Sequence, residues 1–172
     1  MTAPGNQPSP APGTYEIDQA ASAIRFDTRA LFGLLPVRGT FTIGQGRIIV
    51  ADPAEESSVD VVVEAGSFAS GKRQRDEHVR SADYLDVARH PGIGFRSLRL
   101  ERSGEDATLH GELTVRGVTL PLAVTLGAVA QEGRRLTASG TATVDRYAFG
   151  ITKAKGMTGR HLKITLDVVA YR

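Results

Sequence analysis

The segment LTASGTATV, residues 136–144, alternates apolar or small residues with serine and threonine. Because successive side chains of a β-strand point to opposite faces, this period of two predicts a strand with one face turned to a core. The middle of the apolar face is Ala138, Gly140 and Ala142, which together carry almost no side-chain volume. The segment therefore predicts a strand that leaves room inside the fold.

The same period of two recurs along most of the sequence, between clusters of Gly, Pro, Asp and Ser. Seven or eight such segments, with almost no helical periodicity, predict an all-β fold, an eight-stranded antiparallel barrel. In residues 95–100 the apolar phase slips by one position, which predicts a β-bulge or a strand covered on both faces. Gly117 lies between two strand-like runs and suits a hairpin turn. Besides 136–144, the alternating segments are residues 24–29, 47–50, 59–63, 109–115, 120–126 and 162–168.

One segment breaks this pattern. The stretch GKRQRDEHVRSADYLDV, residues 71–87, is mostly polar and charged. Val79 and Ala82 lie three positions apart and can share a helical face, so we predict a short helical insertion at about residues 72–87. Residues 81–83, where Ser81 and Asp83 can bond to nearby backbone groups outside a helix, mark the place where the insertion would divide into two pieces. A helical segment among strands suggests a lid over one end of the barrel.

Length and composition limit the class of protein. A chain of 172 residues predicts one domain, and 41% hydrophobic with 23% charged residues is typical of a soluble globular protein. The absence of cysteine excludes disulfides, thiolate nucleophiles and iron–sulfur clusters. A net charge of +2 is too small for a nucleic-acid-binding surface, so no nucleic-acid partner is expected.

Residues 1–13 contain four prolines, two glycines and no charged side chain. This composition predicts a disordered, proline-rich arm, followed by the barrel domain at residues 14–172. The sequence contains no stretch that resembles a signal peptide and no apolar run long enough for a membrane helix. We therefore expect a cytoplasmic protein without stable membrane insertion.

The small side chains of residues 136–144 leave two alternatives for the interior. A large void is unfavourable, because lost packing costs about 24 cal/mol per Å³ of cavity. Aromatic side chains of facing strands would fill the space in one alternative, and Phe26, Phe41, Phe95 and Phe149 are available for that role. In the other alternative an apolar ligand occupies a dry pocket.

Three stretches carry more specific motifs. They are GKRQRDEHVRSADYLDVARHPGIGFRS at residues 71–97, GELTVRGVTLP at residues 111–121 and RYAFGI at residues 146–151. Together they resemble the YceI family of lipocalin-like, polyisoprenoid-binding bacterial proteins, and the resemblance extends over about residues 15–171. It implies an eight-stranded lipocalin-like barrel with a helical insertion after the fourth strand. It also implies an apolar tunnel that holds an isoprenoid chain or a similar lipid.

On this resemblance we expect a non-catalytic protein that binds a long apolar lipid, a polyisoprenoid or an isoprenoid quinone, for transport or storage. No metal and no cofactor other than this ligand are expected. The inward phase of the strands predicts the ligand-lining residues, which are Phe26, Phe41, Phe95, Leu113, Val115, Leu122, Val124, Ala138, Gly140, Ala142 and Phe149. The residues expected at the lipid head group or in a lid are Arg75, Asp76, His78 and Tyr84.

Two other functions stay open. An enzyme acting on a lipid-like substrate would use Asp76 and His78 for proton transfer, although residues two apart on a helix do not face each other. We expect instead that Arg75 and Asp76 pair and hold the insertion against the barrel. The second alternative is a solid barrel that works through its surface as a homodimer.

Two connecting segments are unusual. The stretch RALFGLLP, residues 29–36, is too apolar to face water in the usual way. It could cover the barrel mouth, form a subunit contact or touch a membrane during lipid exchange, and we favour the first two. The stretch TKAKGMTGR, residues 152–160, is basic and could bind phosphate, although a solvated hairpin loop fits it better.

Overall fold

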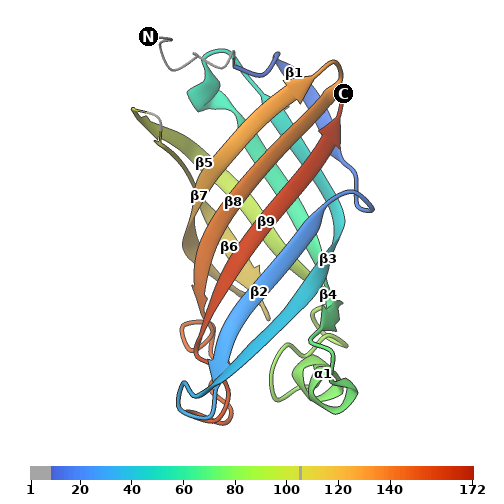
Figure 1. Cartoon of the computed structure of the whole chain (residues 1–172), viewed down its shortest axis with the longest axis vertical. Coiled ribbons are helices and arrows are strands. Elements are labelled where there is room, and N and C mark those ends of the chain that lie inside the picture. The colour runs from blue at the N-terminus through green and yellow to red at the C-terminus, as the bar shows by residue number, and fades with distance from the viewer. Residues whose placement is uncertain (1–8, 105) are drawn as a thin grey trace.

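Long strands build the wall of a barrel (Figure 1). The computed structural model describes residues 9–104 and 106–172. Most strands alternate more buried and more exposed positions, as expected for a sheet with one face in the core. The strands are β1 (Gly13–Ile17), β2 (Ala23–Ala30), β3 (Leu35–Val50), β4 (Ser58–Ala69), β5 (Gly92–Ser103), β6 (Asp106–Val115), β7 (Val118–Glu132), β8 (Arg135–Asp145) and β9 (His161–Tyr171).

The sheet closes on itself as a ring of eight strands. Strands β2 to β9 pair antiparallel with their neighbours in sequence, and β9 pairs with β2. The additional strand β1 fills the space between β3 and β9 beyond the start of β2, where Ile17 pairs with Ala170. The Asp18 carboxylate accepts N–H bonds from Ala20 and Ala21, which stabilises the bend between β1 and β2. The predicted eight-stranded antiparallel barrel is confirmed.

The helical insertion is present but shorter than the predicted 72–87. Helix α1 (Arg73–Arg80) ends where Ser81 becomes extended, with ψ of 172°, and residues 81–91 form turns and irregular structure. The Ser81 hydroxyl donates to the His78 carbonyl at 2.5 Å, so this serine favours the end of the helix over a further turn. Helix α1 lies at one end of the barrel, beside β4, and a 3-10 turn, η1 (Ala54–Glu56), lies at the other (Figure 1). In the described residues no helix is long and apolar enough to cross a membrane.

Two predicted local features of the strands are confirmed. In residues 95–100 the pairing of β5 with β6 shifts by one residue after Ser97, and Leu98 is left 62% exposed. This is the predicted β-bulge. Arg116 and Gly117 connect β6 to β7 with φ of 51° and 75°, the two positive values that a type I′ hairpin turn requires.

The two ends of the barrel differ. At the end opposite α1, Tyr15, Leu136 and Ala170 pack into an almost fully buried apolar cluster that closes the interior. The Tyr15 hydroxyl donates to the Ala11 carbonyl at 2.7 Å and so ties part of the predicted arm to this end. Residues 1–8 of that arm lie outside the described residues. At the α1 end the strands lead into longer connections, so an opening into the barrel is expected there.

Candidate functional site

An apolar cavity of about 250 Å³ lies inside the barrel. Every strand of the eight-membered ring contributes side chains to its wall, and among the described wall residues only Ser139 and Arg146 carry polar side-chain atoms. Engineered apolar cavities of roughly 150 Å³ stay dry and bind small apolar molecules. We therefore expect this larger cavity to exclude water and to accept an apolar ligand.

The cavity exists because β8 supplies little bulk. Ala138, Gly140 and Ala142 all face it, as the sequence pattern predicted. Phe95 does not compensate, because its ring lies over Gly111, where a Cβ would be only 2.6 Å from the ring Cζ. The aromatic side chains that were expected to fill the interior line its wall or lie beside it, and the space between the strands remains open.

The structure places ten of the eleven predicted lining residues on the wall of this cavity. The exception is Phe26, which lines a second pocket nearer α1 and stacks on Phe68 with ring centroids 4.9 Å apart. Phe26 is drawn aside because Gly39, its partner on β3, has no Cβ; one would lie 2.4 Å from the Phe26 ring. The ten wall residues are Phe41, Phe95, Leu113, Val115, Leu122, Val124, Ala138, Gly140, Ala142 and Phe149.

Several wall residues were missed in the sequence. Ile43 and Ile48 are five positions apart, so an unbroken strand would turn them to opposite faces, but a register shift between Ile43 and Gln45 brings both inside. Gly44 and Gly46 are the only sign of that shift in the sequence. Alternation in the last strand would have sufficed to find the wall residues Leu162, Ile164, Leu166 and Val168.

A second cavity of about 500 Å³, here called the mouth pocket, lies at the α1 end. Apolar side chains such as Phe26 and Phe68 form its inner part. Its outer part is polar and includes Lys72, Gln74, Arg75, His78, Tyr84 and Thr158. Five residues line both cavities, so the two cavities adjoin: Phe41, Leu85, Arg146, Ile151 and Leu162.

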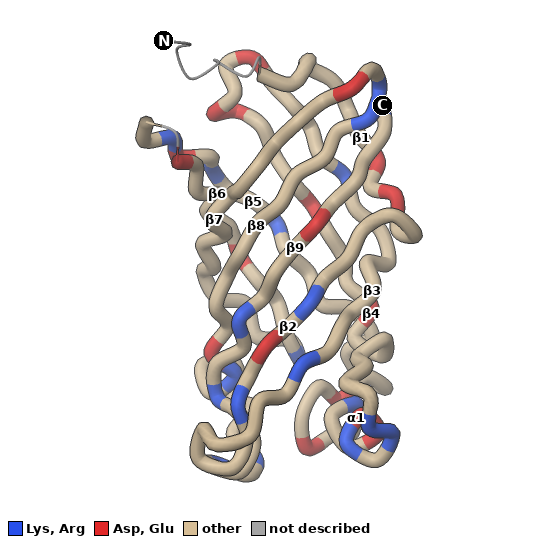
Figure 2. Tube along the Cα trace, viewed as in Figure 1, with Lys and Arg blue, Asp and Glu red and all other residues tan. Residues whose placement is uncertain are grey.

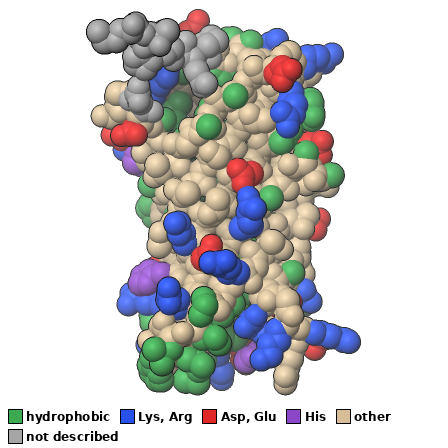
Figure 3. Space-filling view, viewed as in Figure 1, with side chains coloured by type: hydrophobic (Ala, Val, Ile, Leu, Met, Phe, Trp, Pro, Cys, Tyr) green, Lys and Arg blue, Asp and Glu red, His purple; other side chains and the backbone are tan. Residues whose placement is uncertain are grey.

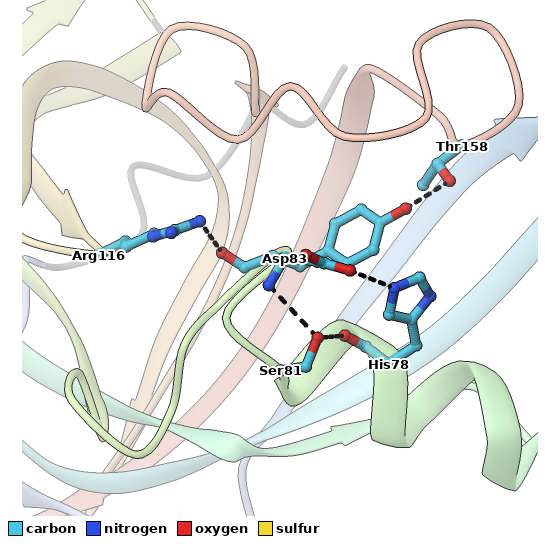
Figure 4. Close-up of polar contacts among 6 residues, drawn as sticks. His78, Ser81, Asp83, Arg116 and Thr158 are labelled. Carbon is cyan, nitrogen blue, oxygen red and sulfur yellow. Dashed lines mark hydrogen bonds and ion pairs between the residues drawn. The ribbon is translucent and has the colours of Figure 1, made fainter.

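A hydrogen-bonded network crosses the rim of the mouth pocket (Figure 4). The hydroxyls of Tyr84 and Thr158 lie 3.0 Å apart, and Arg116 donates to the Tyr84 carbonyl at 3.0 Å. His78 Nε2 lies 2.9 Å from an Asp83 carboxylate oxygen, and mainly this hydrogen bond holds the pKa of Asp83 below its ordinary value of 3.8. The pair's contribution to stability is therefore present above that pH and is lost as the pH falls through the lowered pKa.

Arg75 and Asp76 both anchor α1 to the end of β4, but not by pairing with each other. The Asp76 carboxylate, 8% exposed, accepts the Ser70 N–H at 3.0 Å and the Ser70 hydroxyl. Arg75 Nε donates to the same hydroxyl at 2.7 Å. Within the described residues no ion pair joins Arg75 to Asp76, so the expected contact is wrong although the anchoring role stands. Asp76 lies off the mouth pocket, whereas Arg75 and His78 line it.

Arg146 lies where the two cavities meet and is 6% exposed. Its guanidinium donates to the carbonyls of Gly159, Ile151 and Thr158 at 2.7, 2.8 and 3.0 Å. These bonds fold the connection 146–160 back over the mouth. Arg146 was not among the site residues predicted from the sequence, although it opens the RYAFGI motif.

A larger depression of about 650 Å³ lies on the outer wall of the barrel. Four of its five charged side chains pair with each other in water: Arg47 with Glu16 at 2.9 Å and Arg96 with Glu112 at 3.5 Å. These solvated pairs need no ligand. In the part of the chain that the structure describes, no three His, Asp or Glu side chains gather as a metal site. The candidate site is therefore the barrel cavity with its mouth pocket.

Comparison with known proteins agrees with the motifs. Residues 15–170 match the family model of the YceI-like domain. A UPF0312 protein of Ectopseudomonas mendocina (strain ymp) is 32% identical over 142 residues, 78% of this chain and 74% of the relative. The UPF0312 protein Shew185_3055 of Shewanella baltica (strain OS185) is 34% identical over 122 residues, 67% of this chain and 64% of the relative.

Solved structures share the fold. Burkholderia cenocepacia BcnA superposes with a TM-score of 0.80 at 22% identity, over 89% of this chain and 98% of BcnA. A polyisoprenoid binding domain from Saccharophagus degradans, implicated in plant cell wall breakdown, gives 0.69 at 16% identity, over 91% of this chain and 97% of that domain. At these identities the likeness concerns the fold alone. With the match over residues 15–170, the chain belongs to the YceI-like domain family.

Proposed function

We propose that this protein binds one long apolar lipid, a polyisoprenoid or an isoprenoid quinone, and carries or stores it. The chain of the lipid would occupy the barrel cavity and its head group the mouth pocket. One observation carries the proposal: an apolar cavity, closed at the Tyr15 end, adjoins a polar-rimmed pocket at the other end. The polyisoprenoid binding domain of Saccharophagus degradans has the same fold and supports this choice of ligand.

The energetics favour an occupied cavity. At about 24 cal/mol per Å³, an empty cavity of about 250 Å³ would cost roughly 6 kcal/mol of stability. The free energy of unfolding of a folded protein is only about 5–15 kcal/mol. A lipid chain that buries several hundred Å² would gain on the order of 10 kcal/mol at about 25 cal/mol per Å², before the cost of ordering it. Such a ligand would remain bound through purification.

The enzymatic alternative lacks its acid–base pair. The Asp76 carboxylate binds Ser70 and lies off the mouth pocket, and His78 pairs with Asp83. His78 and Asp83 are about half exposed at the rim. No serine is among the described residues that line the mouth pocket, and the Ser81 hydroxyl beside this pair donates to the His78 carbonyl. A proton-transfer role for Asp76 with His78 has no support in this geometry.

The solid-barrel alternative requires a filled interior, and the cavity argues against it. Partnership with a second copy of the chain stays a separate prediction, which the oligomeric state in solution would test.

A fluorescence displacement assay tests the proposal. Diphenylhexatriene is a neutral apolar rod whose emission rises in apolar surroundings, and the chain contains no tryptophan to interfere. Delipidated protein should enhance its emission, and long polyprenols or quinones should displace it at a ratio of one per chain. Emission that does not rise, or that no isoprenoid lowers, would contradict lipid binding in the barrel.

A further inference from the structure

Exposed apolar side chains gather at one place on the molecule, the end that carries α1 (Figure 3). Of the ten exposed large hydrophobic residues in the described part of the chain, five lie here, on two neighbouring connections and the first residue of β3. We call this group the apolar tip; its residues are Leu31, Phe32, Leu34, Leu35 and Met157. Phe32 is 78% and Leu34 is 82% exposed, and neither lines the mouth pocket. The connection after β2 therefore does not cover the mouth, which was one of the roles expected for it.

The backbone holds the tip in this conformation. Leu31, Phe32 and Gly33 are all left-handed, with φ of 49°, 54° and 87°. That conformation is unfavourable for bulky residues such as leucine and phenylalanine, and it persists only when the surroundings enforce it. Here the Leu31 N–H donates to the Met157 carbonyl at 3.0 Å and the Phe32 N–H to the Gly156 carbonyl at 2.6 Å. Backbone hydrogen bonds between the connection after β2 and the connection before β9 therefore hold the exposed side chains in place.

The Phe32 ring packs against a glycine of the neighbouring connection. It lies over Gly156, where a Cβ would be 2.5 Å from the ring Cε1. Met157 follows directly in the chain and lines the mouth pocket, as does Ala30 at the other base of the tip. The apolar tip and the opening of the barrel are therefore one continuous surface.

Charge is distributed unevenly along the barrel (Figure 2). The connections at the α1 end carry ten Lys or Arg against four Asp or Glu, a balance of +6 in a chain whose total is +2. Those at the opposite end carry four acidic residues and one basic residue. The first set is residues 31–34, 70–91, 116–117 and 146–160, and the second is residues 18–22, 51–57 and 133–134. Lys153 and Lys155 lie on the same connection as Met157 and form no ion pair within the described residues.

We propose that the apolar tip docks on the surface of a bilayer with anionic head groups. Phe32 and Leu34 would enter the boundary between head groups and acyl chains, and Lys153 and Lys155 would contact lipid phosphates. A second copy of the chain is a poorer occupant, because a twofold contact through this end would bring two surfaces of +6 together. Docking would bring the mouth pocket to the membrane, where a bound lipid could be exchanged. The exchange of lipid rests on the proposed function, whereas the docking itself does not.

Co-sedimentation of the full chain with vesicles tests the docking. The protein should bind vesicles of phosphatidylcholine mixed with phosphatidylglycerol at least tenfold more tightly than pure phosphatidylcholine, and added salt should weaken the binding. The pair Phe32→Asn and Leu34→Ser should lower the affinity about tenfold or more, and asparagine suits the left-handed backbone at position 32. Lys153→Gln with Lys155→Gln should have a similar effect on the anionic vesicles only. Leu98→Ser is the matched control, since it removes an apolar side chain that is 62% exposed on β5.

Three outcomes would overturn the docking. They are wild-type protein that does not sediment with anionic vesicles, an equal loss in Leu98→Ser, and a dimer in sedimentation equilibrium that the tip substitutions dissociate, which would identify a second copy as the occupant. Displacement of diphenylhexatriene in vesicle-free solution should be unchanged in the tip variants. If that assay fails in the wild type while vesicle binding persists, the proposed function fails and the docking stands.

Discussion

Filling the cavity is expected to stabilise the empty protein and to weaken lipid binding at the same time. Ala142 faces the cavity, is 8% exposed and packs with Leu109 and Val124. The substitution Ala142→Leu adds three carbon atoms to this wall. At about 0.8 kcal/mol per buried CH₂ group, the lipid-free protein should gain up to about 2 kcal/mol in its free energy of unfolding. The same atoms occupy ligand space, and about 2 kcal/mol of lost burial corresponds to roughly a 30-fold higher Kd.

Two measurements check the expected gain in stability and the expected loss of lipid affinity. Urea unfolding of delipidated protein gives the change in stability, and displacement of diphenylhexatriene by a polyprenol gives the change in affinity. Thr143→Leu is the control, because Thr143 is exposed on the outer face of the same strand and should change neither quantity by a comparable amount. Gly140→Leu is less suitable, since a Cβ there would lie 3.0 Å from Val124 Cγ1. An Ala142→Leu protein that is less stable and binds lipid as before would refute the assignment of this wall.

Three further predictions follow from the site. Ala138→Leu narrows the cavity toward its closed end, so binding of a long polyprenol should weaken while that of farnesol is retained; equal losses for both would contradict the proposed direction of the lipid. Tyr84→Phe removes the hydroxyl contact with Thr158, worth about 1 kcal/mol, and should speed lipid release roughly fivefold in stopped-flow exchange; an unchanged rate would show that the rim does not limit release. His78→Leu, which leaves no side-chain donor, should raise the pKa of Asp83 toward 3.8, as followed by its carboxyl carbon in NMR titration, and an unmoved pKa would exclude the hydrogen bond as its cause.

Strand periodicity was sufficient to predict the barrel and much of its wall, because inward and outward positions differ in polarity along β6 to β9. It failed where the period is broken. The register shift after Ile43 hid the inward face of the second half of β3, and the glycine beside Phe26 moved that ring into the mouth pocket. The alternation of apolar and polar residues along one strand indicates neither the register shift nor the moved ring. Both depend on which residue of the neighbouring strand lies opposite.

Contacts at the mouth were harder to predict for a different reason. His78 pairs with Asp83 and not with Asp76, because the helix ends at Arg80 and the following turn brings Asp83 back to it. Arg146 is held by carbonyl groups of a connection with no regular structure. Such contacts follow from the path of loops, which local propensity does not determine.

Native mass spectrometry of the purified protein, followed by organic extraction and identification of what is released, tests lipid binding in the barrel most directly. If the barrel binds lipid as proposed, we expect one lipid per chain, with a long isoprenoid or comparably apolar tail. The roughly 30-fold higher Kd should also lower the fraction of Ala142→Leu chains that carry this added mass. A protein that shows only its own mass and takes up neither polyprenols nor quinones when they are supplied would contradict the central claim that the barrel interior is a lipid site.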